Sequence, residues 1–311
     1  PPPHTPPKTA PTTKLHTLLH RRQLDLDEPI ATYRPEFAQH GKGTITTRQV
    51  LSHRTGLPGY GRPVTLDDLG DRDGVRSILA NARPWYEPDT MSCYAPLTFG
   101  DLLAEVIERT TGVPFNGFFR RELADPLDAD FHFGLPNEEA DRVSAIWPHD
   151  PAPPHDSPIA QAALSELGTV EDWIEPRHLP TVLPAAGGIG NARALARIGC
   201  VLAGNGTVDG RRHLGPEIIA AARSTQSRTE DEMVGWVRYG LGFGLDTDDY
   251  PGPTPDSMHW GGYGGSFLAM DPVAGVSFAF AQNQLQRDGG PRDDPRRIEF
   301  WRLFREITGT R

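Results

Sequence analysis

Residues 259–283 read HWGGYGGSFLAMDPVAGVSFAFAQN, and this stretch decides the type of fold. The pieces GGSFLAMD at 264–271 and GVSFAFAQN at 275–283 have the length and apolar content of strands. The residues DPVAG between them have the chemistry of a hairpin turn. The segment WVRYGLGFGLD at 236–246 has the same character. We therefore predict antiparallel strands in the last part of the chain.

Helical patterns precede these strands. Residues 98–112, TFGDLLAEVIERTTG, predict an amphipathic helix closed by Gly112, and residues 192–204 predict another that ends at Gly204. Residues 44–60, TITTRQVLSHRTGLPGY, predict a short helix followed by a turn. The region from 134 to 185 is rich in Pro, Asp and His without clear periodicity, so we expect long loops there.

The two ends of the chain carry further helix signals. Residues 1–11, PPPHTPPKTAP, contain six prolines, and Pro11 would deny a helix an interior N–H, so we expect the first helix to begin near Thr12 or Thr13. Its leucine stripe runs on to Pro29. A closing helix begins at Asp294 and Pro295 and ends at Gly309. Its expected buried face consists of Ile298, Trp301, Phe304 and Ile307.

Composition bounds the classes of partner. The 311 residues carry a formal charge of -10, with no local Lys/Arg cluster, which disfavours nucleic-acid binding. No apolar run is long enough to span a membrane, and no export signal is visible, although the compartment stays open. Cys93 and Cys200 are expected to be independent buried thiols. The oligomeric state cannot be read from the sequence.

Together these patterns predict the α/β (α+β) class, with an antiparallel sheet flanked by helices and a mainly helical lobe. We expect a single domain over 1–311. The helical lobe covers about 44–220, and the sheet region covers 12–30 and 235–311. A cleft between two such parts is a natural ligand site.

Four segments resemble the penicillin-recognising serine hydrolase family, which includes class C β-lactamases, D,D-peptidases and related esterases. VLSHRTGLPGY (50–60) is similar to the family's LLSHTSGLP signature, and HWGGYGGSFLAMDP (259–272) to its HxGxGG strand. PAAGGIGNARALARIGCVLAGNGTVDGRRHLGPE (184–217) and RYGLGFGL (238–245) match further family segments. The resemblance implies a β-lactamase/transpeptidase-like fold and acyl-transfer chemistry without a metal or organic cofactor.

The resemblance implies a nucleophile and a lysine in an SxxK motif. Counting back from Leu24 places Lys8 at the lysine and Thr5 at the nucleophile, in the run Thr5-Pro6-Pro7-Lys8. Threonine supplies the hydroxyl, but its methyl group crowds a tetrahedral intermediate. Only four residues precede Thr5, whereas relatives place strands before this helix. We therefore expect an uncovered sheet edge, in a chain that is incomplete or has lost part of the catalytic core.

Other site residues follow from the same resemblance. Tyr94 matches the tyrosine of the family's YxN motif, with Pro96 where the family has Asn. His259, Trp260 and Gly261 match the HxG variant found in esterases. His259 and Trp260 are expected to line the acyl pocket, and the amide of Gly262 to hold the oxyanion together with the nucleophile's own amide. The Ser52-His53 pair lies in a segment that is structural in the family.

The sequence thus predicts an acyl-transfer hydrolase, most simply an esterase or a β-lactamase-related enzyme acting on a small ester or amide. Its expected catalytic residues are Thr5, Lys8 and Tyr94. A non-catalytic protein that keeps the cleft as a binding module is the alternative, favoured by the changes at Thr5 and Pro96. Cell-wall D,D-peptidase activity is less supported, because the strand motif carries His259 rather than lysine.

Overall fold

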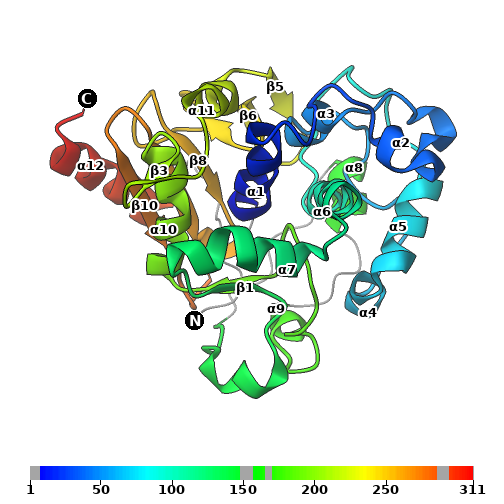
Figure 1. The fold of residues 1–311 in the computed structure, drawn as a ribbon, viewed down its shortest axis with the longest axis horizontal. Coiled ribbons are helices and arrows are strands. Elements are labelled where there is room, and N and C mark those ends of the chain that lie inside the picture. Colours follow the sequence, from blue (N-terminus) through cyan, green and yellow to red (C-terminus); the bar gives the residue numbers. More distant parts are fainter. Residues whose placement is uncertain (1–7, 148–156, 165–169, 286–293, 311) are drawn as a thin grey trace.

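The computed structural model describes residues 8–147, 157–164, 170–285 and 294–310. Its centre is a six-stranded sheet in the order β10-β9-β8-β7-β6-β5, in which every neighbouring pair is antiparallel (Figure 1). The strands are β5 (Ser227–Asp231), β6 (Gly235–Tyr239), β7 (Gly244–Leu245), β8 (Met258–Gly261), β9 (Phe267–Asp271) and β10 (Val276–Phe280). The α+β prediction and the hairpin at residues 271–275 are therefore confirmed.

β5, which is the first strand of this sheet along the chain, was not predicted from the sequence. β5 reads SRTED and contains no large apolar residue, so it lacks the pattern by which strands are recognised. It pairs along its whole length with β6 at one edge of the sheet. At the other edge, β9 is the one sheet partner of β10 among the described residues.

Helices cover both faces of the sheet. α12 (Pro295–Thr308) packs through Trp301 on Phe267 and on the apolar side chains of β10. Its cap at Asp294 and its end at Gly309 are as predicted, but Ile298 and Ile307 are 55% and 84% exposed. The predicted four-residue face was therefore too wide, because α12 lies at the surface and buries only a narrow stripe (Figure 1).

The opposite face packs against α10 (Ala192–Ala203) and, beyond it, α1 (Thr9–His20). Asn191 caps α10 by accepting a hydrogen bond from Ala194 N–H, and Gly199 brings the helix close to the sheet. A Cβ atom at Gly199 would lie 2.2 Å from Ser277 Oγ. The helix predicted over 192–204 is confirmed.

The start of α1 differs from the prediction. The helix begins at Thr9, one turn earlier than expected, with Lys8 in helical conformation as its N-cap. Pro11 is the third helical residue, where no backbone N–H has an intrahelical partner, so the ring removes no hydrogen bond. The helix also ends earlier, at His20, and Leu24 and Leu26 lie in the following loop.

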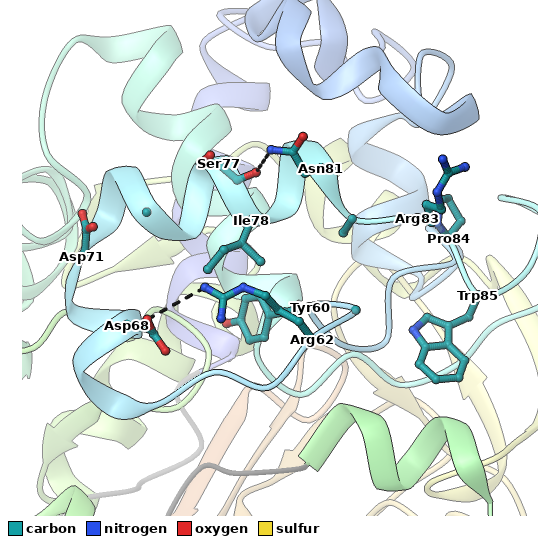
Figure 2. A pocket seen from close by; sticks show the side chains of 13 residues that line it. Tyr60, Arg62, Asp68, Asp71, Ser77, Ile78, Asn81, Arg83, Pro84 and Trp85 are labelled. Carbon is teal, nitrogen blue, oxygen red and sulfur yellow. Dashed lines mark hydrogen bonds and ion pairs between the residues drawn. The ribbon is translucent and has the colours of Figure 1, made fainter.

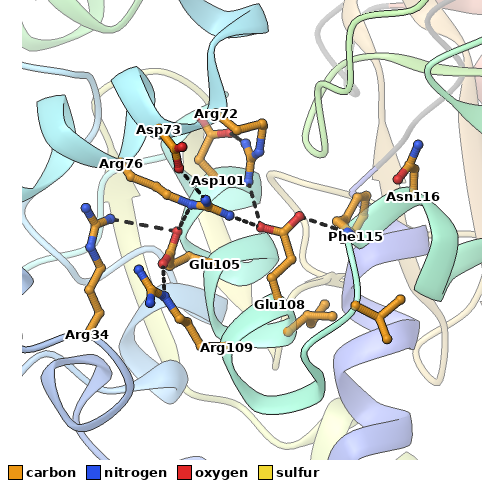
Figure 3. Close-up of polar contacts among 12 residues, drawn as sticks. Arg34, Arg72, Asp73, Arg76, Asp101, Glu105, Glu108, Arg109, Phe115 and Asn116 are labelled. Carbon is orange, nitrogen blue, oxygen red and sulfur yellow. Dashed lines mark hydrogen bonds and ion pairs between the residues drawn. The ribbon is translucent and has the colours of Figure 1, made fainter.

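α6 (Thr98–Thr111) organises the helical part of the molecule and ends at Gly112 in a left-handed conformation, as predicted. Its carboxylates form an ion cluster with arginines of neighbouring segments and with Arg109 of α6 itself (Figure 3). Glu105, which is 2% exposed, lies 3.8 Å from Arg34 Nη1, accepts from Arg109 Nε at 2.8 Å, and pairs with Arg76. This cluster fixes the helices around α6 relative to each other.

Short elements complete the chain. The other helices are α2 (Ile30–Tyr33), η1 (Pro35–Gly41), α3 (Thr47–Leu51), α4 (Leu66–Gly70), α5 (Arg72–Asn81), α7 (Phe115–Phe119), η2 (Arg120–Ala124), η3 (Asp125–Leu127), η4 (Asn137–Arg142), α8 (Pro158–Leu164), α9 (Val170–Trp173), α11 (Pro216–Arg223) and η5 (Tyr263–Gly265). Two small antiparallel pairs are β1 (Phe131–Phe133) with β2 (Gly188–Gly190), which are far apart in the sequence, and β3 (Thr207–Val208) with β4 (Arg211–Arg212), which form a short hairpin. Within the residues of 134–185 that are described, the expected loops are interrupted by η4, α8 and α9. In the part of the chain that the structure describes, no helix has the length and apolar content of a membrane span.

Candidate active site

Lys8 occupies a buried position at the beginning of α1. Its side chain is held by two backbone carbonyls, because Nζ donates to Ala95 O at 3.3 Å and also to Pro96 O. The same Nζ lies 4.5 Å from the centre of the Tyr94 ring. The structure therefore brings two of the expected catalytic residues, Lys8 and Tyr94, into contact.

Burial changes the chemistry of this lysine. It lowers the pKa of Lys8 well below its usual range, with the Asp101 carboxylate acting in the opposite direction. A neutral amine has two N–H donors and one lone pair. The carbonyls of Ala95 and Pro96 take both donors, which leaves the lone pair free to accept a proton. This arrangement suits a general base.

Pro96 stands where the family has Asn, and this change removes less hydrogen bonding from Lys8 than the sequence suggested. A family asparagine would offer a side-chain amide, and Pro96 has none. Its backbone carbonyl nevertheless accepts a hydrogen bond from Lys8. The lysine thus keeps an acceptor at this position.

Tyr94 meets Trp260 on its other side. Trp260 Nε1 donates to Tyr94 Oη at 3.3 Å, and the two rings lie 5.2 Å apart. Burial raises the pKa of Tyr94, and the hydrogen bond from Trp260 opposes this shift. The phenol therefore keeps its proton at neutral pH and is available as an acid.

Trp260 and His259 lie on opposite faces of β8, because successive side chains of a strand alternate. Trp260 faces Tyr94, whereas the His259 ring stacks on Tyr250 at 4.8 Å and packs edge-on against Trp301 of α12. Burial and the charge of Arg297 and Arg238 lower the pKa of His259 to about 3. We therefore propose Trp260, and not His259, as a pocket residue.

The glycine run after β8 forms a turn. β8 ends at Gly261, and Gly264 and Gly265 adopt φ of +82° and +106°, which favours glycine at both positions. The N–H of Gly262 donates to Ser266 O at 2.7 Å. Its proposed role as oxyanion donor requires this N–H to be shared with, or released to, the substrate oxygen.

Thr5, the expected nucleophile, lies outside the described residues. Its role therefore remains a proposal that rests on its position three residues before Lys8. The described part of the site consists of Lys8, Tyr94 and Trp260.

Two further residues that the sequence analysis did not assign to the site hold the backbone around Tyr94. Asp231 Oδ2 accepts from Tyr94 N–H at 2.6 Å, and His53 Nδ1 accepts from Ala95 N–H at 3.1 Å. The His53 carbonyl accepts from Cys93 N–H at 2.9 Å. His53 is a non-glycine residue with φ of +58°, so its backbone is held in the left-handed region. The pattern of the sequence gives no signal for these long-range contacts.

A separate groove of about 750 Å³ lies along α4, α5 and the adjoining loops (Figure 2). Tyr60, Arg62, Asp68 and Trp85 line it together with other residues of this region. None of Lys8, Tyr94 and Trp260 contributes to its wall. The groove is therefore distinct from the candidate active site.

The fold is of the β-lactamase/transpeptidase type, and Lys8 and Tyr94 lie in contact within it. The beta-lactamase family profile matches residues 8–300, so the chain belongs to the beta-lactamase family. Several of the proteins that match this chain are named as esterases or carboxylesterases.

The individual similarities agree with this assignment. The chain is 34% identical over 292 residues to Esterase/beta-lactamase LipL of Mycobacterium tuberculosis, covering 88% of this chain and 66% of LipL. A family VIII carboxylesterase of known crystal structure is 30% identical to this chain, with a TM-score of 0.88. The match covers 96% of this chain and 81% of the carboxylesterase chain. A penicillin-binding protein homologue from Caulobacter crescentus is also 30% identical, with a TM-score of 0.86 and the same coverage. The chain thus spans just under two thirds of LipL's length.

Proposed function

We propose that this chain hydrolyses small carboxylic esters by acyl transfer, with Thr5 as nucleophile, Lys8 as general base and Tyr94 as general acid. The observation that carries this proposal is the contact of a buried, carbonyl-held lysine with Tyr94, whose phenol oxygen accepts from Trp260. A protein that only bound a ligand would have no need for a desolvated lysine beside a buried phenol. The arrangement therefore favours the enzyme over the binding module.

The proposed reaction has two steps, acylation of Thr5 and hydrolysis of the acyl-enzyme. Thr5 Oγ1 attacks the ester carbonyl while its proton passes to Lys8 Nζ, and the tetrahedral oxyanion forms. As the intermediate collapses, Tyr94 gives its proton to the departing alkoxide, and the proton on Lys8 restores the phenol. Water then repeats the sequence on the acyl ester of Thr5. The amides of Gly262 and Thr5 are the proposed donors to the oxyanion.

The surroundings of Tyr94 indicate the type of substrate. The rings of Trp260 and Tyr239 lie in one buried aromatic cluster on this side of the sheet, with ring centres 5.9 Å apart. Among the described residues, Lys8 is the one charged side chain over the Tyr94 ring, and Asp231 accepts only from the backbone N–H of Tyr94. An uncharged acyl group fits such a wall better than a peptide carboxylate does. We propose short-chain esters as substrates, in keeping with the esterase names of LipL and of Esterase EstB of Burkholderia gladioli.

The test compares hydrolysis of p-nitrophenyl acetate and of a chromogenic cephalosporin by the parent protein and four variants. We expect ester hydrolysis by the parent, and losses of about 100-fold or more in kcat for Thr5→Ala, Lys8→Met and Tyr94→Phe. Tyr33→Phe is the matched control, since Tyr33 is a partly buried tyrosine of α2 that has no assigned role in the reaction, and it should retain parental activity. Equal background rates for the parent and all variants would reject the enzyme and favour the binding module.

A further inference from the structure

The short segment that carries Tyr94 has every backbone donor satisfied by another part of the molecule. The N–H groups of Cys93, Tyr94 and Ala95 donate in turn to His53 O, Asp231 Oδ2 and His53 Nδ1, at 2.9, 2.6 and 3.1 Å. The following carbonyls accept from Lys8. The segment is thus held without belonging to a helix or strand, and its position depends on side chains.

Asp231 is built into the sheet as a fixed acceptor. It is the last residue of β5 and is 3% exposed. Its Oδ1 accepts from Met233 N–H at 2.9 Å and from Val234 N–H at 3.3 Å, so the carboxylate is oriented by the turn that follows. Its Oδ2 accepts from Tyr94 N–H and, at 2.9 Å, from the hydroxyl of Tyr239. A buried carboxylate with four donors is a costly feature that a surface turn does not require.

His53 holds the segment from the helical side. A backbone N–H can only donate, so Nδ1 of His53 must be the acceptor and the ring must be neutral with its proton on Nε2. Burial and the nearby Lys8 lower the pKa of His53 well below its usual range, which agrees with this state. The ring also packs against the rings of Tyr94 and Phe99, at 5.1 and 4.8 Å.

We propose that Asp231 and His53 are positioning residues that clamp the backbone of Tyr94 from the sheet side and the helical side, so that its phenol faces Trp260 and its ring faces Lys8. Neither Asp231 nor His53 forms a hydrogen bond with the phenol of Tyr94 or with the amine of Lys8. Their effect on the reaction is therefore exerted through Tyr94. This inference rests on the proposed function for its kinetic consequences, but its structural content stands without it.

The kinetic test uses Asp231→Asn, Asp231→Ala and His53→Gln, with Glu232→Gln as a matched control on the exposed neighbouring residue. We expect Asp231→Ala to lower kcat roughly 10- to 100-fold with little change in KM, because a displaced acid slows chemistry more than binding. Asp231→Asn should lie between Ala and the parent, since the amide keeps one acceptor oxygen. Glu232→Gln should match the parent.

A double-mutant cycle separates positioning from general damage. In a Tyr94→Phe background, Asp231→Asn should cause no further loss of kcat, because its effect passes through the phenol. Additive losses in the double variant would overturn the proposal. Circular dichroism and urea unfolding of each variant identify any that fail to fold, and the milder Asp231→Asn and His53→Gln then carry the test.

A spectroscopic readout keeps the inference independent of the esterase proposal. The seven tyrosines are labelled with ¹³C at Cζ, and the signal of Tyr94 is assigned as the one missing from Tyr94→Phe. Asp231→Asn and Asp231→Ala weaken or remove the acceptor of the Tyr94 N–H, so each should shift the ¹³Cζ signal of Tyr94 at neutral pH, while Glu232→Gln leaves it unchanged. An unaltered Tyr94 signal in both Asp231 variants would refute the clamp. A parent that hydrolyses no ester but shows the shift would reject the proposed function alone.

Discussion

His16 offers a test of the buried interior at a position that the proposed reaction does not use. The side chain lies in α1, is fully buried, and packs against Phe243 with ring centres 5.9 Å apart. Neither ring nitrogen has a hydrogen-bond partner within the described residues. Burial lowers the pKa of His16 from 6.5 to about 4.

The sign of the effect on stability follows from proton binding. Below pH 6.5 the unfolded chain protonates His16, whereas the folded protein does so only near pH 4, so stability falls as the pH drops. Between pH 7 and pH 5, protonation of His16 in the unfolded chain lowers the free energy of unfolding by about 2 kcal/mol, at about 1.4 kcal/mol per pH unit. Burial raises the pKa of Asp231, so this carboxyl changes stability in the opposite direction as the pH drops. Because the parent and the His16 variant share this effect, the parent serves as the reference.

The assay is urea unfolding of the parent and His16→Leu at pH 7 and pH 5. Relative to the parent, the variant should lose about 2 kcal/mol less on acidification, because it has no group to protonate there. Leu15→Val exchanges one side chain that does not titrate for another in the same helix, so it should lower stability equally at both pH values. The reasoning is wrong if His16→Leu loses as much stability as the parent between pH 7 and pH 5.

Three further changes test the site and the packing. Trp260→Phe removes the N–H that donates to Tyr94 and should lower kcat roughly fivefold to tenfold, as measured by steady-state ester hydrolysis; an unchanged kcat would show that this hydrogen bond plays no part. Gly199→Ala places a Cβ against the sheet and should cost about 1–3 kcal/mol in urea unfolding, whereas Gly43→Ala, where a Cβ makes only an ordinary contact at 3.7 Å, should cost little; equal costs would contradict the packing. Glu105→Gln leaves the buried Arg34 without the carboxylate that it pairs with, and removes one carboxylate from Arg76 and Arg109. It should cost about 3–5 kcal/mol in the same assay, and a loss below about 1 kcal/mol would mean that the cluster is well solvated.

The sequence predicts local structure well where the pattern is local. The hairpin at 271–275, the left-handed end of α6 at Gly112 and the cap of α12 at Asp294 each depend on a few neighbouring residues. β5 was missed because a polar edge strand owes its structure to its partner. The start of α1 was misplaced because Pro11 was treated as an interior residue, although it lies in the first turn, where its ring is tolerated.

The site was predicted in part. The motif positions led to Lys8 and Tyr94, which lie in contact. Strand alternation alone shows that His259 and Trp260 cannot both face Tyr94, so this point was available from the sequence. Asp231 and His53 were not available, because their hydrogen bonds to Tyr94 and Ala95 span 137 and 42 residues of chain and arise only from tertiary packing.

The most direct test of Thr5 as the nucleophile is to phosphonylate its hydroxyl with a reagent that releases fluoride and leaves a stable mimic of the tetrahedral intermediate. The protein is treated with a fluorophosphonate ester, digested with trypsin, and mapped by mass spectrometry, with Lys8→Met treated in parallel. The account predicts one stoichiometric adduct on the tryptic peptide that contains Thr5 and ends at Lys8, and no adduct on the longer peptide, ending at Lys14, that Lys8→Met gives in its place. An adduct on another peptide, or equal labelling of Lys8→Met, would contradict it.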